Sequence, residues 1–361
     1  MLPSILAAYN LTPATVALLF LSQLTGYSVA ALTSSLLSSR IGLARMLLLA
    51  SISLTSALVM YALVAYWPLM VASGTLLGLG IGLIDAGINT YIADQRNANL
   101  IGILHAFYGI GALLGPALAT TLLLVGLGWR LIYLVFAGVV GLTVAGMLWA
   151  VVYNYQPMTV RMTAPGTNAG ASLRLALRTP TVLVAGLLLL VYVGTEASVG
   201  NWAYSVQTLS RGTPQWIAGY GVSAYWLGLT VGRLGMGRLV QYLGAVRTID
   251  FSLALLMAGL LSWWFLPGQL LSLPAIGFAL AAIFPATIWL MPQRLPKAVV
   301  PAAIGFLTSF ASLGAATIPT AVGWSAARAG LEIVPALMVP LALVMVALHR
   351  WLVHHAPAKH D

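Results

Sequence analysis

The sequence predicts an all-α membrane protein built from two related helical bundles. Hydrophobic residues make up 61% of the 361 positions and charged residues only 6%, whereas soluble domains carry about 25% charged residues. Apolar runs of about 20 residues, the length that crosses the hydrocarbon core as a helix, recur along the whole chain. Similar segments also recur about 200 positions apart. The alternating ~10-residue pattern of a membrane β-barrel is not seen.

We expect eleven membrane-spanning helices with short loops between them. Arginines gather in every second loop, so the positive-inside rule places those loops in the cytoplasm. The same rule places the C-terminus there, which makes the chain a multi-pass protein of the cell membrane. The expected spans are 14–37, 45–65, 69–93, 99–125, 130–153, 181–206, 215–240, 248–266, 269–291, 301–325 and 332–353.

A polar stretch divides the chain into two halves. The predicted units are an N-terminal bundle at 1–153, a cytoplasmic linker at 154–180, a C-terminal bundle at 181–353 and a cytoplasmic tail at 354–361. We expect the linker to be an ordinary solvated loop. The alternative is a short basic amphipathic helix at the membrane surface, formed by Ser172 to Arg178.

The two halves resemble each other in sequence, as expected of a transporter built by duplication. The segment from Gly26 to Arg45 matches that from Gly228 to Arg247 at a constant offset, with Gly42 opposite Gly244. By this offset, the counterpart of the span 181–206 falls almost wholly before Met1. We therefore expect most of a first helix of twelve to be missing, with its outer end at residues 1–10. A genuine eleven-helix protein is the alternative.

An acidic residue in the middle of an apolar helix is the first candidate for function. Asp85 lies about 13 Å into the bilayer by helical rise, where a carboxylate costs roughly 2.5 to 3.5 kcal/mol. Such residues usually mark ion or substrate pathways. A hairpin turn near residue 96 would bring Asp85 level with His105. We predict that Asp85 binds a coupling proton and that His105 is its partner or a substrate ligand. The structural alternatives are an interhelix contact for Asp85 and simple packing for His105.

A second group of polar side chains in the other half suits a sugar. Glu196 is followed by Asn201 and Trp202, which offer a carboxylate, an amide and an aromatic face. Sugar hydroxyls bond to the first two groups, and the C–H face of the ring stacks on the third. Tyr108 and Gln23 are weaker candidates, for which a structural role is the alternative.

These segments resemble the major facilitator superfamily, in particular its fucose-permease-like sugar:proton symporter branch. The loop SSRIGLAR is similar to the cytoplasmic signature of the family at Arg40 and Gly42, although Ser35, Ser39 and Leu43 depart from it. GLGIGLIDAGINTYIAD resembles the fourth helix of the branch, which implies that Asp85 and Asn89 face a cavity. The resemblance implies two six-helix bundles that rock about a central site.

Some residues are expected to serve the conformational change instead of binding. They belong to the duplicated loops and glycine-rich helices, and Arg233 is expected to cap the helix or form an ion pair near the cytoplasmic end of its helix. The predicted conformational residues are Arg40, Gly42, Arg45, Gly228, Arg233 and Gly244.

Several function classes lack support in the sequence. GLGIG lies inside an apolar helix with no preceding strand, so it is not a nucleotide-binding loop. The basic residues are scattered, which argues against nucleic acid, and no hydrolase or metal motif occurs. We expect no enzyme activity, cofactor or metal, with H⁺ as the coupling ion, a small solute and the bilayer as partners, and a monomer.

Three functions remain open from the sequence. Proton-coupled uptake of a sugar or similar polar solute is favoured, because acid, amide and aromatic groups gather at mid-depth. A proton-coupled exporter of drugs or metabolites is the alternative, and a membrane sensor without transport is the third.

Overall fold

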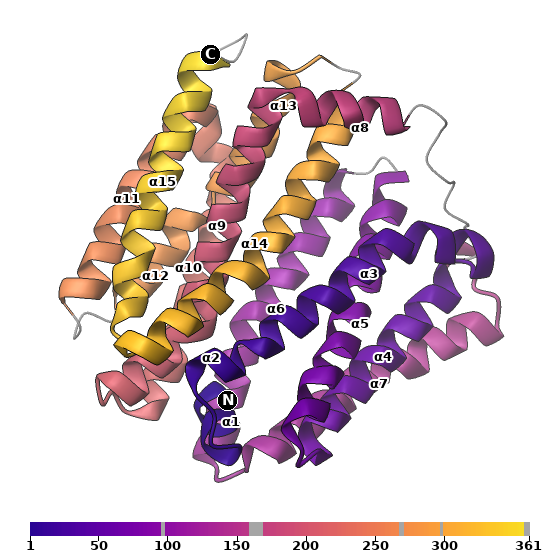
Figure 1. Ribbon diagram of the computed structural model, residues 1–361. Coiled ribbons are helices and arrows are strands. Elements are labelled where there is room, and N and C mark those ends of the chain that lie inside the picture. The colour runs from indigo at the N-terminus through magenta and orange to yellow at the C-terminus, as the bar shows by residue number, and fades with distance from the viewer. Residues whose placement is uncertain (95–97, 159–168, 267–270, 297–298, 357–361) are drawn as a thin grey trace.

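Helices form nearly the whole chain in the computed structural model (Figure 1). It describes residues 1–94, 98–158, 169–266, 271–296 and 299–356. No strand occurs in these ranges, which confirms the predicted all-α class.

The N-terminal half contains two short helices followed by five long ones. Thr12 caps the second of them by accepting a hydrogen bond from the Thr15 amide, and Pro13 occupies its first turn. The helices are α1 (Leu2–Ala8), α2 (Pro13–Val16), α3 (Leu18–Ile41), α4 (Leu43–Leu63), α5 (Trp67–Asp94), α6 (Ala98–Leu124) and α7 (Trp129–Val152).

The linker and the C-terminal half follow. The linker contains a 3-10 turn at Gln156–Met158 and the helix α8 (Ala169–Arg178), so the alternative of a short helix is correct and the favoured plain loop is wrong for these residues. The other helices are α9 (Pro180–Ser205), which continues as the π-turn η2 (Val206–Ser210), α10 (Gln215–Leu243), α11 (Ala245–Phe265), α12 (Ser272–Leu280), α13 (Ile283–Arg294), α14 (Val300–Ala329) and α15 (Ile333–His355).

Ten helices of the described chain are long and apolar enough to cross a membrane. The expected span 215–240 corresponds to α10, which has 29 residues and would reach about 43 Å. It is not among the ten, because polar residues, including Arg233 and Arg238, interrupt its apolar sequence. The expected span at 269–291 is broken between α12 and α13. Pro285 has no amide to bond the Ala281 carbonyl, which explains the break.

The predicted duplication is confirmed by matched helix contacts. In the first half, an added Cβ at Gly26 would lie 1.9 Å from the Thr75 carbonyl oxygen, so α3 and α5 meet backbone to backbone. In the second half, a Cβ at Gly228 would lie 2.2 Å from the Pro274 carbonyl oxygen, where α10 meets α12. Only glycine permits such approaches.

The duplicated loops also share a backbone turn. Gly42, between α3 and α4, has φ 84° and ψ 160°, and Gly244, between α10 and α11, has φ 79° and ψ 158°. A positive φ favours glycine, because it has no Cβ to clash with the backbone. The expected correspondence of these two glycines is therefore correct.

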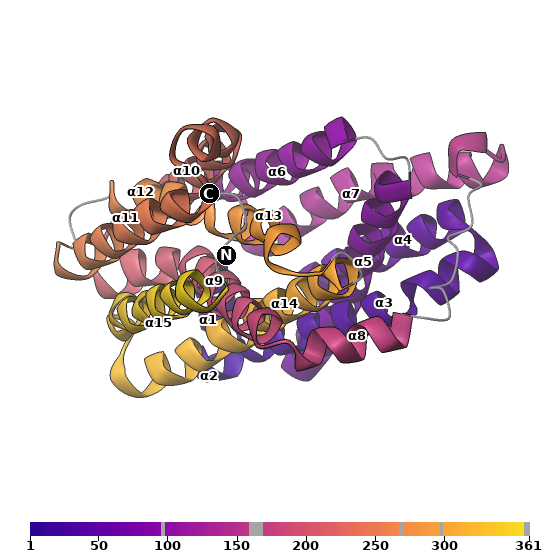
Figure 2. The same ribbon diagram turned by 90° about the horizontal axis from the view of Figure 1, so that it is seen from above.

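The two halves meet along two seams, one formed by α6 and α10 and the other by α14 with α2 and α3. Seen from above, α6 lies beside α10, and α14 lies beside α2 and α3 (Figure 2). The α6–α10 seam is tight at the end away from the linker, where a Cβ at Gly219 would lie 2.0 Å from Thr120 Oγ1. Nearby, the hydroxyls of Thr121 and Tyr220 are 3.0 Å apart. Thr320 also donates a 3.4 Å hydrogen bond to the Ala17 carbonyl.

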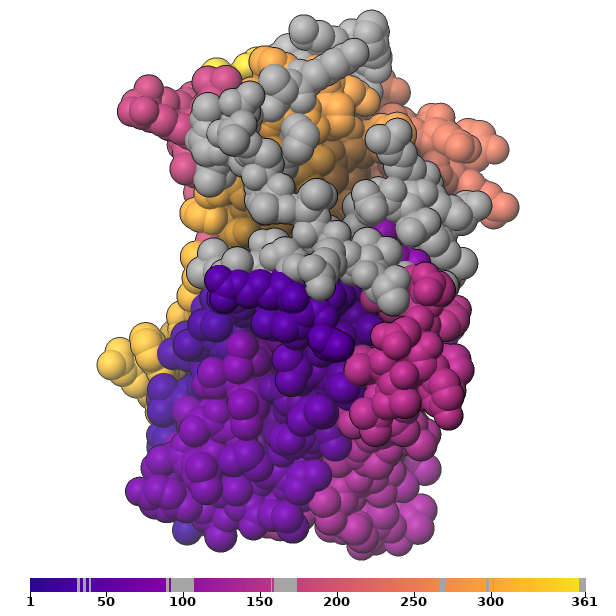
Figure 3. All heavy atoms as spheres, turned by 90° about the vertical axis from the view of Figure 1, so that its right-hand side faces the viewer, coloured from indigo at the N-terminus to yellow at the C-terminus, as the bar shows by residue number. Residues whose placement is uncertain are grey.

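The halves differ in how completely their helices are covered. In the C-terminal half, α14 packs on α9, and a Cβ at Gly314 would lie 2.0 Å from the Leu190 carbonyl oxygen. The segment GALLGP, from Gly111 on α6, matches GAATIP, from Gly314, so Gly111 is the counterpart glycine. Neither Gly111 nor Gly115 has any neighbour within 4 Å of an added Cβ. In the space-filling view, the early residues, coloured indigo to violet, lie beside the magenta residues of α7 (Figure 3).

Candidate transport site

Asp85 belongs to α5, and the close contact of α5 with α3 determines where its carboxylate lies. A Cβ at Gly78 would lie 1.9 Å from the Gln23 carbonyl oxygen, and Asp85 follows two turns later, near the same face. The exposed carboxylate accepts a 2.6 Å hydrogen bond from Tyr27 Oη of α3. Tyr27 also lies close enough to Ser312 of α14 to interact with its hydroxyl, where α3 meets α14. Asp85 therefore lies beside the boundary between the halves.

Glu196 of α9 is the centre of a second charged group. Its Oε2 accepts a short hydrogen bond from Tyr192 Oη, one helical turn earlier, and a 3.4 Å hydrogen bond from the Arg233 guanidinium of α10. Tyr225 Oη donates to the backbone carbonyl of Glu196 at 3.0 Å. Because the carboxylate is almost completely buried, these donors replace the water it would otherwise bind.

Tyr108 of α6 connects the two charged groups. More than half of its surface is exposed, and it lies close enough to Asp85, Glu196 and Arg233 to interact electrostatically with each of them. The site therefore combines two carboxylates, a guanidinium and several phenols, contributed by both halves. Such groups can bind a proton and bond to a polar solute.

Two of the predicted solute ligands have packing partners. Trp202 is completely buried, its Nε1 donates to the Pro319 carbonyl at 3.0 Å, and Phe20 packs edge-on against its ring. The ring face of Trp202 is therefore closed to a sugar in this conformation. Gln23 Nε2 donates to Tyr61 Oη at 3.5 Å, inside the N-terminal half.

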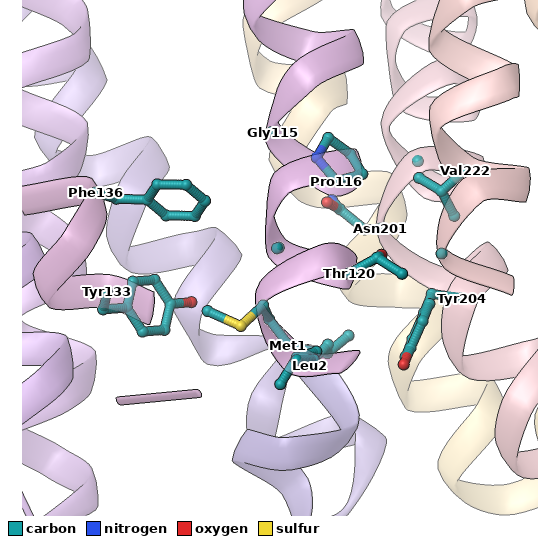
Figure 4. A pocket seen from close by; sticks show the side chains of 14 residues that line it. Met1, Leu2, Gly115, Pro116, Thr120, Tyr133, Phe136, Asn201, Tyr204 and Val222 are labelled. Atoms are coloured by element: carbon teal, nitrogen blue, oxygen red, sulfur yellow. The ribbon is translucent and has the colours of Figure 1, made fainter. Parts of the chain in front are cut away.

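Asn201 lines a separate cavity of about 280 Å³. Figure 4 shows it with Thr120, Tyr133, Tyr204 and the Met1 side chain around the same space. Most of the other lining residues are apolar, and Glu196 is not among them. Glu196 and Asn201, which the sequence placed in one solute site, are therefore separated: Asn201 lines this cavity and Glu196 does not.

The remaining candidates fall into two groups. The side chains of Asn89 and His105 lie outside the described residues. Of the conformational residues, Arg40 and Arg45 are exposed on either side of the turn at Gly42.

Arg233 has a different place from the one expected. It pairs with Glu196 of α9, ten residues before the end of α10, or about 15 Å along the helix. The expected pairing is present, but the prediction that Arg233 lies near the helix end is wrong, because α10 continues to Leu243.

Sequence reasoning missed the tyrosines that serve the two carboxylates. Tyr192 precedes Glu196 by four residues, a spacing that puts both side chains on one helix face. This four-residue spacing could have been recognised from the sequence. Tyr27 lies 58 positions from Asp85, and only the three-dimensional packing of α3 on α5 connects them.

Two duplicated helical halves that share a charged site at their boundary define a membrane transport protein. A sequence model of the Major Facilitator Superfamily matches residues 1–276. The chain belongs to this family, and it is a transporter, not an enzyme.

Curated relatives and solved structures agree with this assignment. The chain is 24% identical to "Bypass of stop codon protein 6" of Saccharomyces cerevisiae, over 96% of this chain and 76% of that protein. It is 23% identical to the glucose/mannose transporter GlcP of Bacillus subtilis, over 96% of this chain and 88% of that one.

Two solved structures have the same fold at low sequence identity. A mutant of the nucleoside transporter NupG superposes with a TM-score of 0.77 at 13% identity, covering 96% of this chain and 93% of that one. A D-xylose-proton symporter superposes with a TM-score of 0.72 at 18% identity, covering 94% and 89%.

Proposed function

We propose that the protein takes up a sugar, or a similar small polar solute, together with a proton by alternating access. The observation that carries the proposal is the Asp85 carboxylate, which is exposed at the boundary between the halves and held by Tyr27 at 2.6 Å. A carboxylate in this position can gain and lose a proton as the boundary opens to either side.

The relatives support the solute class. GlcP carries glucose and mannose by name, and one structural neighbour is named as a xylose-proton symporter. A second structural neighbour is a nucleoside transporter, so the solutes tested for transport should include one that contains ribose. The phenols and carboxylates beside Tyr108 supply the hydrogen-bonding groups that such solutes need.

Transport requires a change between two packed states, and the described contacts between the halves suit one of them. The seam at Gly219 and Thr120 lies at the end of the helices away from the basic loops. By the positive-inside rule this end is extracellular. The conformation is then one closed to the outside.

The test uses purified protein in liposomes. Labelled glucose, mannose, xylose and uridine are measured first in exchange against unlabelled solute, and then in accumulation driven by a pH gradient. One pH unit can support about tenfold accumulation for one coupled proton. We expect Asp85→Asn to abolish this accumulation but to retain exchange.

The matched control is Glu332→Gln, which removes a carboxylate from a loop distant from Asp85 and should leave both measurements unchanged. If Asp85→Asn still accumulates solute with the pH gradient, the proton role is wrong. Failure of every solute to exchange would instead favour a sensor.

An exporter is the second candidate, favoured by the mostly apolar lining of the cavity in Figure 4. In this case an apolar compound, and no sugar, should dissipate an imposed pH gradient in the same liposomes. Dequenching of a pH-sensitive dye inside the vesicles measures this directly.

A further inference from the structure

Arg233 is held by a single long bond to its carboxylate partner. One terminal nitrogen lies 3.4 Å from Glu196 Oε2, and the guanidinium also interacts with the Tyr192 hydroxyl. A guanidinium has five N–H donors in a planar fork. Most of its donors are therefore not used by Glu196.

Another ion pair in the same chain shows an arginine that binds its carboxylate through two nitrogens. Arg211 donates from Nε to Glu332 Oε1 and from a terminal nitrogen to Oε2, both at 2.8 Å. This two-bond arrangement is the strong form of the arginine–carboxylate pair. Arg233 has only half of it, although its partner carboxylate is far more buried than Glu332.

The Arg233 side chain is more exposed than the carboxylate with which it pairs. The Arg233 side chain is 27% exposed, against 9% for that of Glu196. Tyr108, from the opposite half, is near enough to interact with it electrostatically and is itself exposed. The guanidinium thus stands at the boundary between the halves, beside the groups that the proposed function uses.

We propose that Arg233 binds the carboxylate of an acidic sugar, such as a uronic acid, so that the preferred solute is a monoanion. This inference rests on the proposed function, because it names the class of sugar that the same site takes. Arginine matches a carboxylate with two parallel bonds. Glu196 is then a positioning residue, which holds one end of the guanidinium while the solute binds the remainder.

The charge of the site favours one carboxylate over a phosphate. The described groups around Tyr108 include one guanidinium against two carboxylates, which is too little positive charge for a dianion. A monoanion is favoured further when Asp85 carries its proton, because the repulsion from that carboxylate is then absent.

The experiment compares acid and amide forms of the same sugar on the full-length protein. Binding of D-glucuronate, D-galacturonate and their uncharged amides is measured by calorimetry in detergent, and labelled glucose exchange is measured in liposomes. We expect at least one acid to bind tenfold or more tightly than its amide. Arg233→Gln should remove this preference, and Arg233→Lys should retain only part of it.

The control variant is Arg238→Gln, which removes an exposed arginine from the same helix and should keep the full preference. Equal binding of acid and amide by the unaltered protein, with glucose still exchanged, overturns the inference and leaves the proposed function intact. If no sugar of either charge binds or exchanges, both fail. Because the acid–amide ratio is measured on the unaltered protein, poor folding of a variant does not protect the inference.

Discussion

The two halves share one ancestral pattern, yet they present their acidic residues in opposite ways. In the N-terminal half, Asp85 is exposed and Tyr27 is its donor from α3. In the C-terminal half, Glu196 is buried and held by Tyr192 and Arg233. The first arrangement suits a group that exchanges protons with water, and the second suits a fixed scaffold. The comparison suggests that duplication was followed by a division of roles.

Packing differs in the same direction. In the 18-residue span Phe107–Leu124, 17% of the residues are buried, against 67% in an apolar window of the same length within Pro180–Ser210. The large apolar core of the molecule is formed mainly by the C-terminal half, while α3, α4 and α5 share a small cluster around Met46. The C-terminal half should therefore respond more strongly to changes inside its core.

The largest expected effect comes from the glycines that the duplication pairs. Gly314→Ala would put a Cβ 2.0 Å from the Leu190 carbonyl oxygen, so we expect a loss of roughly 3 kcal/mol in stability. Gly111→Ala, at the counterpart position, meets open space and should change stability by less than about 0.5 kcal/mol. Thermal unfolding in detergent measures both. Equal losses of stability in the two variants would mean that the helices at both glycines are packed equally closely, which would contradict the comparison.

An intermediate effect is expected from the tyrosines that serve the two carboxylates. Tyr192→Phe leaves a buried carboxylate short of a donor, which should cost about 2 kcal/mol. Tyr27→Phe should cost less than about 1 kcal/mol, because water can reach Asp85 and replace the hydroxyl. Unfolding of each purified variant in detergent tests the order. A larger loss for Tyr27→Phe would contradict the contrast between an open and an enclosed acid.

The smallest effect concerns the outer ends of the halves. Hydrogen bonds from Arg211 lower the pKa of Glu332, whereas Arg130 bonds to the carbonyls of Ala62 and Val64 at 3.0 and 2.7 Å. A carboxylate with a lowered pKa stabilises the fold above its ordinary pKa of about 4.3, and that stabilisation is lost as pH falls through the lowered value.

Glu332→Gln should therefore cost less than about 1 kcal/mol at neutral pH, with no difference from the unaltered protein in acid. The loss of stability from Arg130→Gln should not change with pH, because the backbone carbonyls that Arg130 binds do not titrate. Unfolding temperatures measured from pH 3 to 7 distinguish the two cases. A pH-independent loss at Glu332 would contradict the assignment.

Two features could be predicted from the sequence: the duplication of the helical bundle and the position of an acidic residue in the membrane. The duplication was visible because close helix contacts demand glycine at matched positions such as Gly26 and Gly228, and Asp85 was visible because a carboxylate is expensive in a bilayer. Side-chain direction was less accessible. Trp202 has the spacing of a solute ligand, but its ring turns into the contact with Pro319 and Phe20, and sequence spacing alone does not reveal which neighbours a helix face meets.

The low hydropathy of α10 also has a consequence for how the protein is made. An arginine deep in a helix opposes its partitioning from the translocon into lipid by roughly 2.5 to 3.5 kcal/mol. We expect α10 to enter the lipid only after α12 has been synthesised, because α12 supplies the contact at Gly228 that covers one face of α10. Insertion and folding of α10 would then be one event. A ribosomal pause after the synthesis of α10 and before that of α12 would produce chains with α10 left outside the bilayer.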